Sequence, residues 1–165
     1  MLTLRPDNAQ KLFLDKHLND TRFIYNKYVE EYLNCIKENR LPNYKDYQVL
    51  RAEHEFLKGS NAWTLQRVLC KFVQTNKINR SKRSKGQKVG LVKFKSKKSH
   101  SNYFYIRIGK LSYNSDYKSE SYVKIPKIGL VNFECKNIKS EFLNSKIKTC
   151  TVKRTKTGEY SIQKY

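Results

Sequence analysis

The first half of the chain repeats its hydrophobic residues at the three- and four-residue spacing that is typical of helices. A short strand is expected at Leu2–Leu4, before a turn at Pro6. Asp7 and Gln10 then have the spacing of a capping box, which predicts a helix that begins there and ends near Leu18. The apolar face expected for this helix consists of Ala9, Leu12 and Phe13.

Three more helices are expected before the middle of the chain. The second runs from about Asp20 to Asn39, and the third begins at a cap on Asn43 and ends at Gly59. The fourth carries Leu65 in its first turns and can continue into the segment that follows it. The second helix has the longest apolar stripe, which consists of Tyr25, Tyr28, Val29, Tyr32, Leu33 and Ile36.

After residue 88 the spacing changes to the two-residue alternation of strands. Strands are expected at Val89–Phe94, Tyr103–Ile108, Tyr122–Ile125, Leu130–Phe133, Ile147–Arg154 and Tyr160–Gln163, the last two joined by a hairpin turn. Short strands at such spacing predict a small β-barrel. Because Leu2–Leu4 cannot form a sheet alone, we expect it to pair with later strands, so that the helices form an insertion. The expected fold class is therefore α+β.

Positive charge is concentrated in the middle of the chain. The net charge is +21; residues 1–75 contribute +3 and residues 101–165 contribute +8. Residues 76–100 contain ten Lys or Arg and no Asp or Glu. Such a run is typical of proteins that bind nucleic-acid phosphates, and a solvated basic linker is the other interpretation. The expected phosphate contacts are Lys77, Arg80, Lys82, Arg83, Lys85, Lys88, Lys93, Lys95, Lys97 and Lys98.

The strand expected at Tyr103–Ile108 has one aromatic and basic face. Tyr103, Tyr105 and Arg107 alternate there with three apolar residues, and such a face can stack unpaired bases. An equally good interpretation is structural, because tyrosine is a favourable strand residue in its own right.

Other kinds of site find little support in the sequence. Cys35, Cys70, Cys135 and Cys150 are scattered without a C-x-x-C pair, which indicates reduced cysteines of a cytosolic protein rather than a zinc site. The three histidines share no ligand spacing. The apolar runs are too short to span a membrane, and no signal peptide is evident.

Six pieces of the sequence resemble, in the same order, the N-terminal part of the TnpB (OrfB) proteins of bacterial insertion sequences, which are compact RNA-guided nucleases. The most specific is "TRFIYNKYV" (Thr21–Val29), which closely matches the family's R-F-V-Y-N signature. The opening "LRPDNAQ" lacks the family's Tyr, and Val92 replaces a Pro before "KFKSKK". The other pieces are "LQRVL" (Leu65–Leu69), "KIPKIGLV" (Lys124–Val131) and "IKTCTVKRTKTGEYSI" (Ile147–Ile162).

The resemblance implies a fold and a function. The fold is an oligonucleotide-binding-like β-barrel, the wedge, over residues 1–7 and 84–165, with an inserted four-helix recognition bundle over residues 8–83 that runs into a basic loop. The function is that of the nucleic-acid-binding lobe of a transposon-encoded, RNA-guided DNA endonuclease, in the bacterial cytoplasm and associated with the nucleoid. The implied partners are a guide RNA from the mobile element, double-stranded target DNA, and a nuclease domain or second polypeptide.

The family's catalytic Asp and Glu, its two metal ions and its zinc-binding cysteines lie beyond the hairpin that ends the present sequence. We therefore expect no catalytic residue, metal or cofactor in this chain, which alone should not cut DNA. Two other functions stay open. One is a nuclease-free regulator that occupies DNA with an RNA guide, and the other is a basic RNA-binding protein of ribosomal type.

The resemblance also points to two residues near the duplex motif that flanks the target. Gln66 opens the helix that faces this motif in relatives, and a glutamine can read adenine in the major groove. Tyr44 stands where the family has a tyrosine, although Ala62 replaces a lysine that some relatives carry. In the signature itself, we expect Phe23 and Tyr25 to pack and Asn26 to hydrogen-bond within the bundle.

Overall fold

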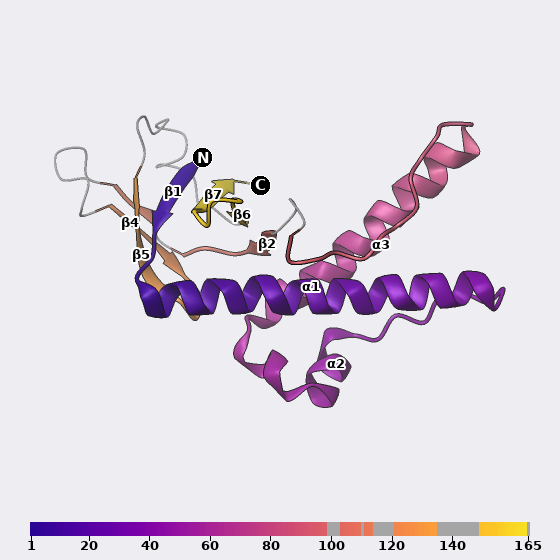
Figure 1. Cartoon of the computed structure of the whole chain (residues 1–165), viewed down its shortest axis with the longest axis horizontal. Helices are drawn as coiled ribbons and strands as arrows, with labels where there is room; N and C mark the ends of the chain where they lie inside the picture. Colours follow the sequence, from indigo (N-terminus) through magenta and orange to yellow (C-terminus); the bar gives the residue numbers. More distant parts are fainter. Residues whose placement is uncertain (99–102, 110, 114–120, 135–148, 165) are drawn as a thin grey trace. The chain divides into compact units, whose positions relative to one another are not determined.

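The computed structural model in Figure 1 describes residues 1–98, 103–109, 111–113, 121–134 and 149–164. Within them the fold is α+β, with three α-helices, one 3-10 helix and a seven-stranded antiparallel sheet. The chain divides into two compact units. We call Met1–Asn19 together with Lys98–Tyr165 the sheet unit, and Asp20–Lys97 the helical unit.

The first strand lies in the interior of the sheet. The strands are β1 (Leu2–Arg5), β2 (Tyr103–Ile106), β3 (Leu111–Ser112), β4 (Tyr122–Ile125), β5 (Gly129–Glu134), β6 (Cys150–Arg154) and β7 (Tyr160–Lys164). Their order is β2-β6-β7-β1-β5-β4-β3. Leu4 pairs with Phe133 of β5 on one side, and Leu2 pairs with Ile162 of β7 on the other. The prediction that the first strand pairs with later strands is therefore confirmed.

The sheet is open, and its chain path requires strong curvature. Ile106 at the end of β2 pairs with Cys150, whereas the backbone amide of Gly109 donates to the carbonyl oxygen of Lys124 in β4 at 3.1 Å. Three residues span at most about 11 Å, but five steps across a flat sheet cover about 24 Å. The strand order therefore curls, although closure into a barrel is not confirmed.

The inner face of this curved sheet carries the core of the sheet unit. The prediction that Phe104, Ile106 and Ile108 share a buried face is confirmed. The first half of α1 (Asn8–Lys37) contributes Leu14 and Leu18 to the same core. The other buried members are Leu2, Leu4, Val123, Ile125, Ile128, Val131, Phe133, Cys150, Val152, Tyr160 and Ile162.

Hydrogen bonds within the sheet unit fix how α1 begins and which face it buries. The capping box is confirmed, because the Gln10 amide donates to Asp7 Oδ1 at 2.7 Å and the Asp7 amide to Gln10 Oε1 at 3.1 Å. Gln10 Nε2 also donates to the carbonyl oxygen of Leu130 at 2.7 Å. The apolar face expected from Ala9, Leu12 and Phe13 is wrong, since all three are exposed and Leu12 reaches 73%.

The two helices expected on either side of Asn19 are one continuous helix, α1. Asp and Asn usually interrupt helices by hydrogen-bonding to nearby backbone. Here the buried carboxylate of Asp20 instead accepts a hydrogen bond from Ser60 Oγ at 2.6 Å, forty residues away in sequence. With no Gly or Pro at this point, α1 continues to Lys37. Two separate helices were therefore a wrong prediction.

The helical unit also contains α2 (Tyr47–Glu53), the 3-10 helix η1 (Glu55–Gly59) and α3 (Ala62–Ser84). The cap of α2 is Asp46 rather than the expected Asn43, because Asp46 Oδ1 accepts from the Gln48 amide at 2.8 Å. Tyr28 and Val29 of the predicted stripe are buried, but Ile36 is 56% exposed. The buried core consists of Ile24, Tyr28, Val29, Leu50, Leu57, Leu65 and Phe72.

The strand expected at Val89–Phe94 is wrong, since these residues form neither helix nor strand. Val92 packs against the core of the helical unit, and Phe94 is 57% exposed. The alternating pattern therefore does not mark a strand here. It marks a segment without helix or strand that packs one apolar side chain, Val92, against the core of the helical unit. In contrast, α3 continues to Ser84, as expected for a helix that runs into the basic segment.

Replacement of Tyr160 by phenylalanine tests how α1 is attached within the sheet unit. Tyr160 Oη donates to Asp15 Oδ1 at 2.6 Å, and Arg154 Nη1 donates to the same oxygen at 3.1 Å. Burial, followed by the bond to Asp15, raises the pKa of Tyr160. We expect Y160F to lower the free energy of unfolding by about 1–2 kcal/mol in urea titrations. The control is Y122F, because the hydroxyl of Tyr122 makes no hydrogen bond among the described residues. Equal stability of both variants would contradict a stabilising role for the bond between Tyr160 and Asp15.

Candidate nucleic-acid interface

The predicted cations lie on the end of α3 and on the segment that follows it. Lys77, Arg80, Lys82 and Arg83 belong to α3, and Lys85 is its C-cap. The last buried residue of α3 is Phe72. Arg83 Nη2 donates to the carbonyl oxygen of Gly90 at 3.2 Å, which holds the following segment beside the helix. We call residues 73–94 the basic arm, the pink helix end and trace in Figure 1.

Nine of the ten cations expose their side chains, and the tenth is Lys95. No Asp or Glu occurs between residues 76 and 100, so the arm has no carboxylate of its own. Neighbours such as Arg80 and Arg83, three residues apart on α3, repel one another weakly. A polyanion bound along the arm would remove this repulsion and release its own counterions, which favours binding at low salt.

Lys95 is held against the first helix instead. Asn26 Nδ2 donates to the carbonyl oxygen of Lys95 at 2.9 Å, and the Lys95 amide donates to Asn26 Oδ1 at 2.8 Å. The Lys95 ammonium group lies 4.2 Å from the centre of the Tyr25 ring, a cation–π contact. Burial lowers the pKa of Lys95. The backbone is therefore fixed at Lys95, which lies between the exposed Lys93 on one side and the exposed Lys97 and Lys98 on the other.

The signature residues have the packing roles that the sequence predicts. Phe23 contacts His54 and Phe56 edge to face, with ring centres 4.8 Å and 5.1 Å away. Tyr25 contacts Phe72 at 5.5 Å. These contacts confirm that Phe23 and Tyr25 pack, but the prediction that Asn26 bonds within the bundle of residues 8–83 is wrong, because its partner is Lys95. The signature thus positions the basic segment through one of its own side chains.

Tyr44 packs against the core face of α3, whereas Gln66 lies away from that face. The Tyr44 ring lies 5.8 Å from Tyr28 and 5.5 Å from Phe72, and burial is the main cause that raises its pKa to about 12. Gln66 is exposed on α3, six residues and so about 120° around the helix from Phe72. Tyr44 therefore has a clear packing role, whereas the side-chain amide of Gln66 is exposed to solvent. Base reading by either residue stays a prediction.

The two tyrosines of the expected aromatic and basic face lie on β2, and Arg107 follows the last residue of this strand. Tyr103 and Tyr105 are half-buried with ring centres 5.5 Å apart, and Arg107 is exposed. Strand pairing places Lys153 of β6 opposite Tyr103. It also places Thr151 of β6 opposite Tyr105, and Gln163 of β7 opposite Thr151. Sequence reasoning missed Lys153 and Gln163, because only the register of β2, β6 and β7 puts them beside the tyrosines.

The described residues contain no group of His, Cys, Asp or Glu that could hold a metal ion. A cavity of about 200 Å³ in the helical unit is lined partly by Glu31 and Glu53. Glu31 pairs with Arg40, and hydrogen bonds from Arg40 and from the Asn43 amide lower its pKa to about 2. Glu53 pairs with Lys45 at 2.5 Å.

Comparison of the sequence with known proteins gives no match, either to a family model or to a curated protein. The resemblance to TnpB proteins therefore stands on the residues quoted for it. None of the described helices has both the length and the apolar character needed to cross a membrane.

Replacement of Asn26 by alanine tests its hold on Lys95. Loss of both hydrogen bonds should lower the free energy of unfolding by about 2 kcal/mol, because two half-buried backbone groups lose their partner. If the basic segment positions nucleic acid, N26A should also weaken binding by about fivefold at low salt, measured by fluorescence anisotropy. N34A, at an exposed position of the same helix, is the control. Unchanged stability of N26A would contradict the inferred hold.

Proposed function

We propose that this chain is the nucleic-acid-binding lobe of a TnpB-type, RNA-guided DNA endonuclease, and that it lacks catalytic residues of its own. The proposal keeps the expected partners: a guide RNA from the mobile element, the duplex DNA that flanks the target, and a nuclease domain or second polypeptide. The catalytic metal ions and the zinc site would belong to that nuclease part.

The observation that carries the proposal is the exposed basic arm together with the attachment of Lys95, the residue directly after it, to α1. Nine exposed cations on and after α3 provide a phosphate-binding track with no carboxylate nearby in sequence. Asn26 joins the two most distinctive pieces of the resemblance, "TRFIYNKYV" and "KFKSKK", through two hydrogen bonds. A resemblance by chance gives no reason for these two pieces to meet.

The finer fold belongs to the same proposal. We propose that the curved sheet is an oligonucleotide-binding-like wedge and that the helices inserted between β1 and β2 form the recognition bundle. The return of β1 to an interior position supports an insertion, and the short path from β2 to Gly109 supports a barrel-like curvature. The outer face of β2 then offers Tyr103, Tyr105 and Arg107 to unpaired bases.

Binding of RNA at increasing salt tests the function. The probe is a structured RNA transcribed from the 3′ end of the chain's own locus, and the control is a scrambled RNA of equal length. If roughly six or more of the exposed cations contact phosphates, affinity should fall about a thousandfold or more between 50 and 200 mM KCl. Equal affinity for both RNAs would contradict a guide-RNA lobe, and co-sedimentation with ribosomal subunits would instead favour a ribosomal-type protein.

The double variant Y103L/Y105L tests base stacking on β2. Leucine keeps an apolar side chain on the strand but removes the aromatic ring, so affinity for single-stranded RNA should fall by at least about fivefold. The free energy of unfolding of the variant serves as the second measurement. A clear loss of stability with unchanged RNA affinity would show that these tyrosines only support the strand.

A further inference from the structure

Two cations that the charge pattern did not single out lie earlier on α3. Arg67 and Lys71 are four residues apart, so they occupy the same side of the helix on successive turns. Both are half-buried, although they lie about 100–160° around α3 from Leu65 and Phe72, which enter the core. They precede the first residue of the basic arm by six and two residues.

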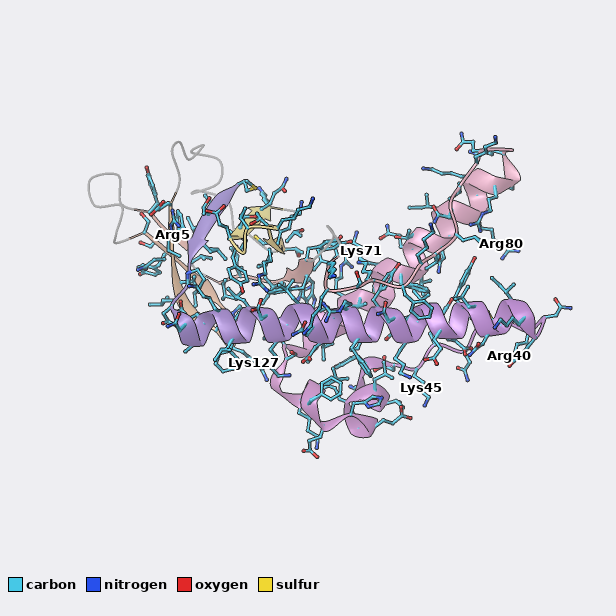
Figure 2. All side chains as sticks on the ribbon, in the orientation of Figure 1. Arg5, Arg40, Lys45, Lys71, Arg80 and Lys127 are labelled. Carbon is cyan, nitrogen blue, oxygen red and sulfur yellow. The ribbon has the colours of Figure 1, made fainter. Side chains whose placement is uncertain are left out.

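Their surroundings are unusual for two neighbouring cations. Arg67 Nε is buried and has no hydrogen-bond partner among the described residues. Lys71 Nζ contacts Gln74 Oε1 at 3.4 Å, and Lys71 is labelled in Figure 2. Burial and the charge of Arg67 both lower the pKa of Lys71. α3 itself contains no Asp or Glu along its 23 residues.

Like charges four residues apart destabilise a helix, and partial burial adds a desolvation cost to each cation. A packing role alone is served better by a neutral side chain of the same length. The arrangement is favourable once an anion lies between the two groups, because the guanidinium and ammonium then share it. Lys82, eleven residues after Lys71, lies on nearly the same side of α3, about 16 Å farther along its axis.

We propose that Arg67 and Lys71 together bind one or two backbone phosphates of a nucleic acid, so that the phosphate track of the basic arm begins on the second turn of α3. This inference rests on the proposed function and deepens it, because it adds two contacts outside residues 76–100. It assigns these residues to positioning of the backbone and not to base reading.

The double variant R67Q/K71Q tests this site in the full chain. The matched control is K45Q/K58Q, which removes two charges from exposed lysines of the same unit that already pair with Glu53 and Glu55. With the 3′-end RNA, R67Q/K71Q should bind about tenfold or more weakly at 100 mM KCl. The slope of log K against log salt should fall by about 0.7 to 1.8, for one or two phosphates lost, and the control should change neither quantity comparably.

Thermal unfolding separates binding from packing. Relief of the repulsion should leave the melting temperature of R67Q/K71Q equal to the wild type or about 1 °C higher. A lower melting temperature that accompanies the binding loss would assign a structural role and overturn the proposal, as would an unchanged affinity and slope. R67K, which keeps the charge, should retain most of the affinity in the presence of Lys71.

A third measurement does not depend on RNA. The melting temperature in phosphate should exceed that in chloride at equal ionic strength, and this difference should shrink in R67Q/K71Q but not in K45Q/K58Q. If the wild type binds no nucleic acid yet shows this behaviour, the proposed function fails and the anion site stands. If the two variants respond alike to phosphate, the anion site is overturned.

Discussion

The rest of the sheet unit depends on the pairing of β1 with β5 and β7. β1 is only four residues long, yet it completes the middle of a seven-strand order whose other members all come after residue 100. The centre of the sheet therefore cannot form until the two ends of the chain meet. This contact closes a long loop, and its entropic cost comes before the gain from pairing β1 with its neighbours. The helices are inserted into this closure, so α1 begins from a fixed strand at Arg5.

A second constraint is the separation of charge from packing. Carboxylates in the described residues form ordinary ion pairs, such as Arg5 with Glu134 and Lys58 with Glu55. Exposed pairs of this kind contribute little to stability. The sequence of the basic arm contains no carboxylate that could form such a pair. The part of α3 that belongs to the arm contains no buried residue, since the last one is Phe72. Its stability therefore depends on helix propensity, on a few backbone contacts and on whatever anion is bound.

The sequence predicts most strands, because alternation such as that of Phe104 and Ile106 needs only one buried face. It predicts poorly wherever a distant partner decides. Asp20 does not break α1, because Ser60 uses its carboxylate, and Leu12 is exposed because the contacts of Gln10 and Asp15 select another face. For the candidate site, the cations were visible in the sequence. Lys153 and the half-buried pair of Arg67 and Lys71 needed strand register and helix packing to be found.

The hold of Asn26 on Lys95 gives a physical link between the packing signature and the proposed binding surface. A segment of lysines without helix or strand would lose much conformational entropy on binding, and each ordered residue costs roughly 1–2 kcal/mol. Two hydrogen bonds and the Tyr25 contact fix one residue in the middle of this segment in the free protein. Part of the ordering cost is then met by folding rather than by binding, which raises the affinity that the neighbouring lysines can give. If these lysines bind nucleic acid as proposed, the signature would contribute to binding by ordering the segment, without a direct contact to the ligand.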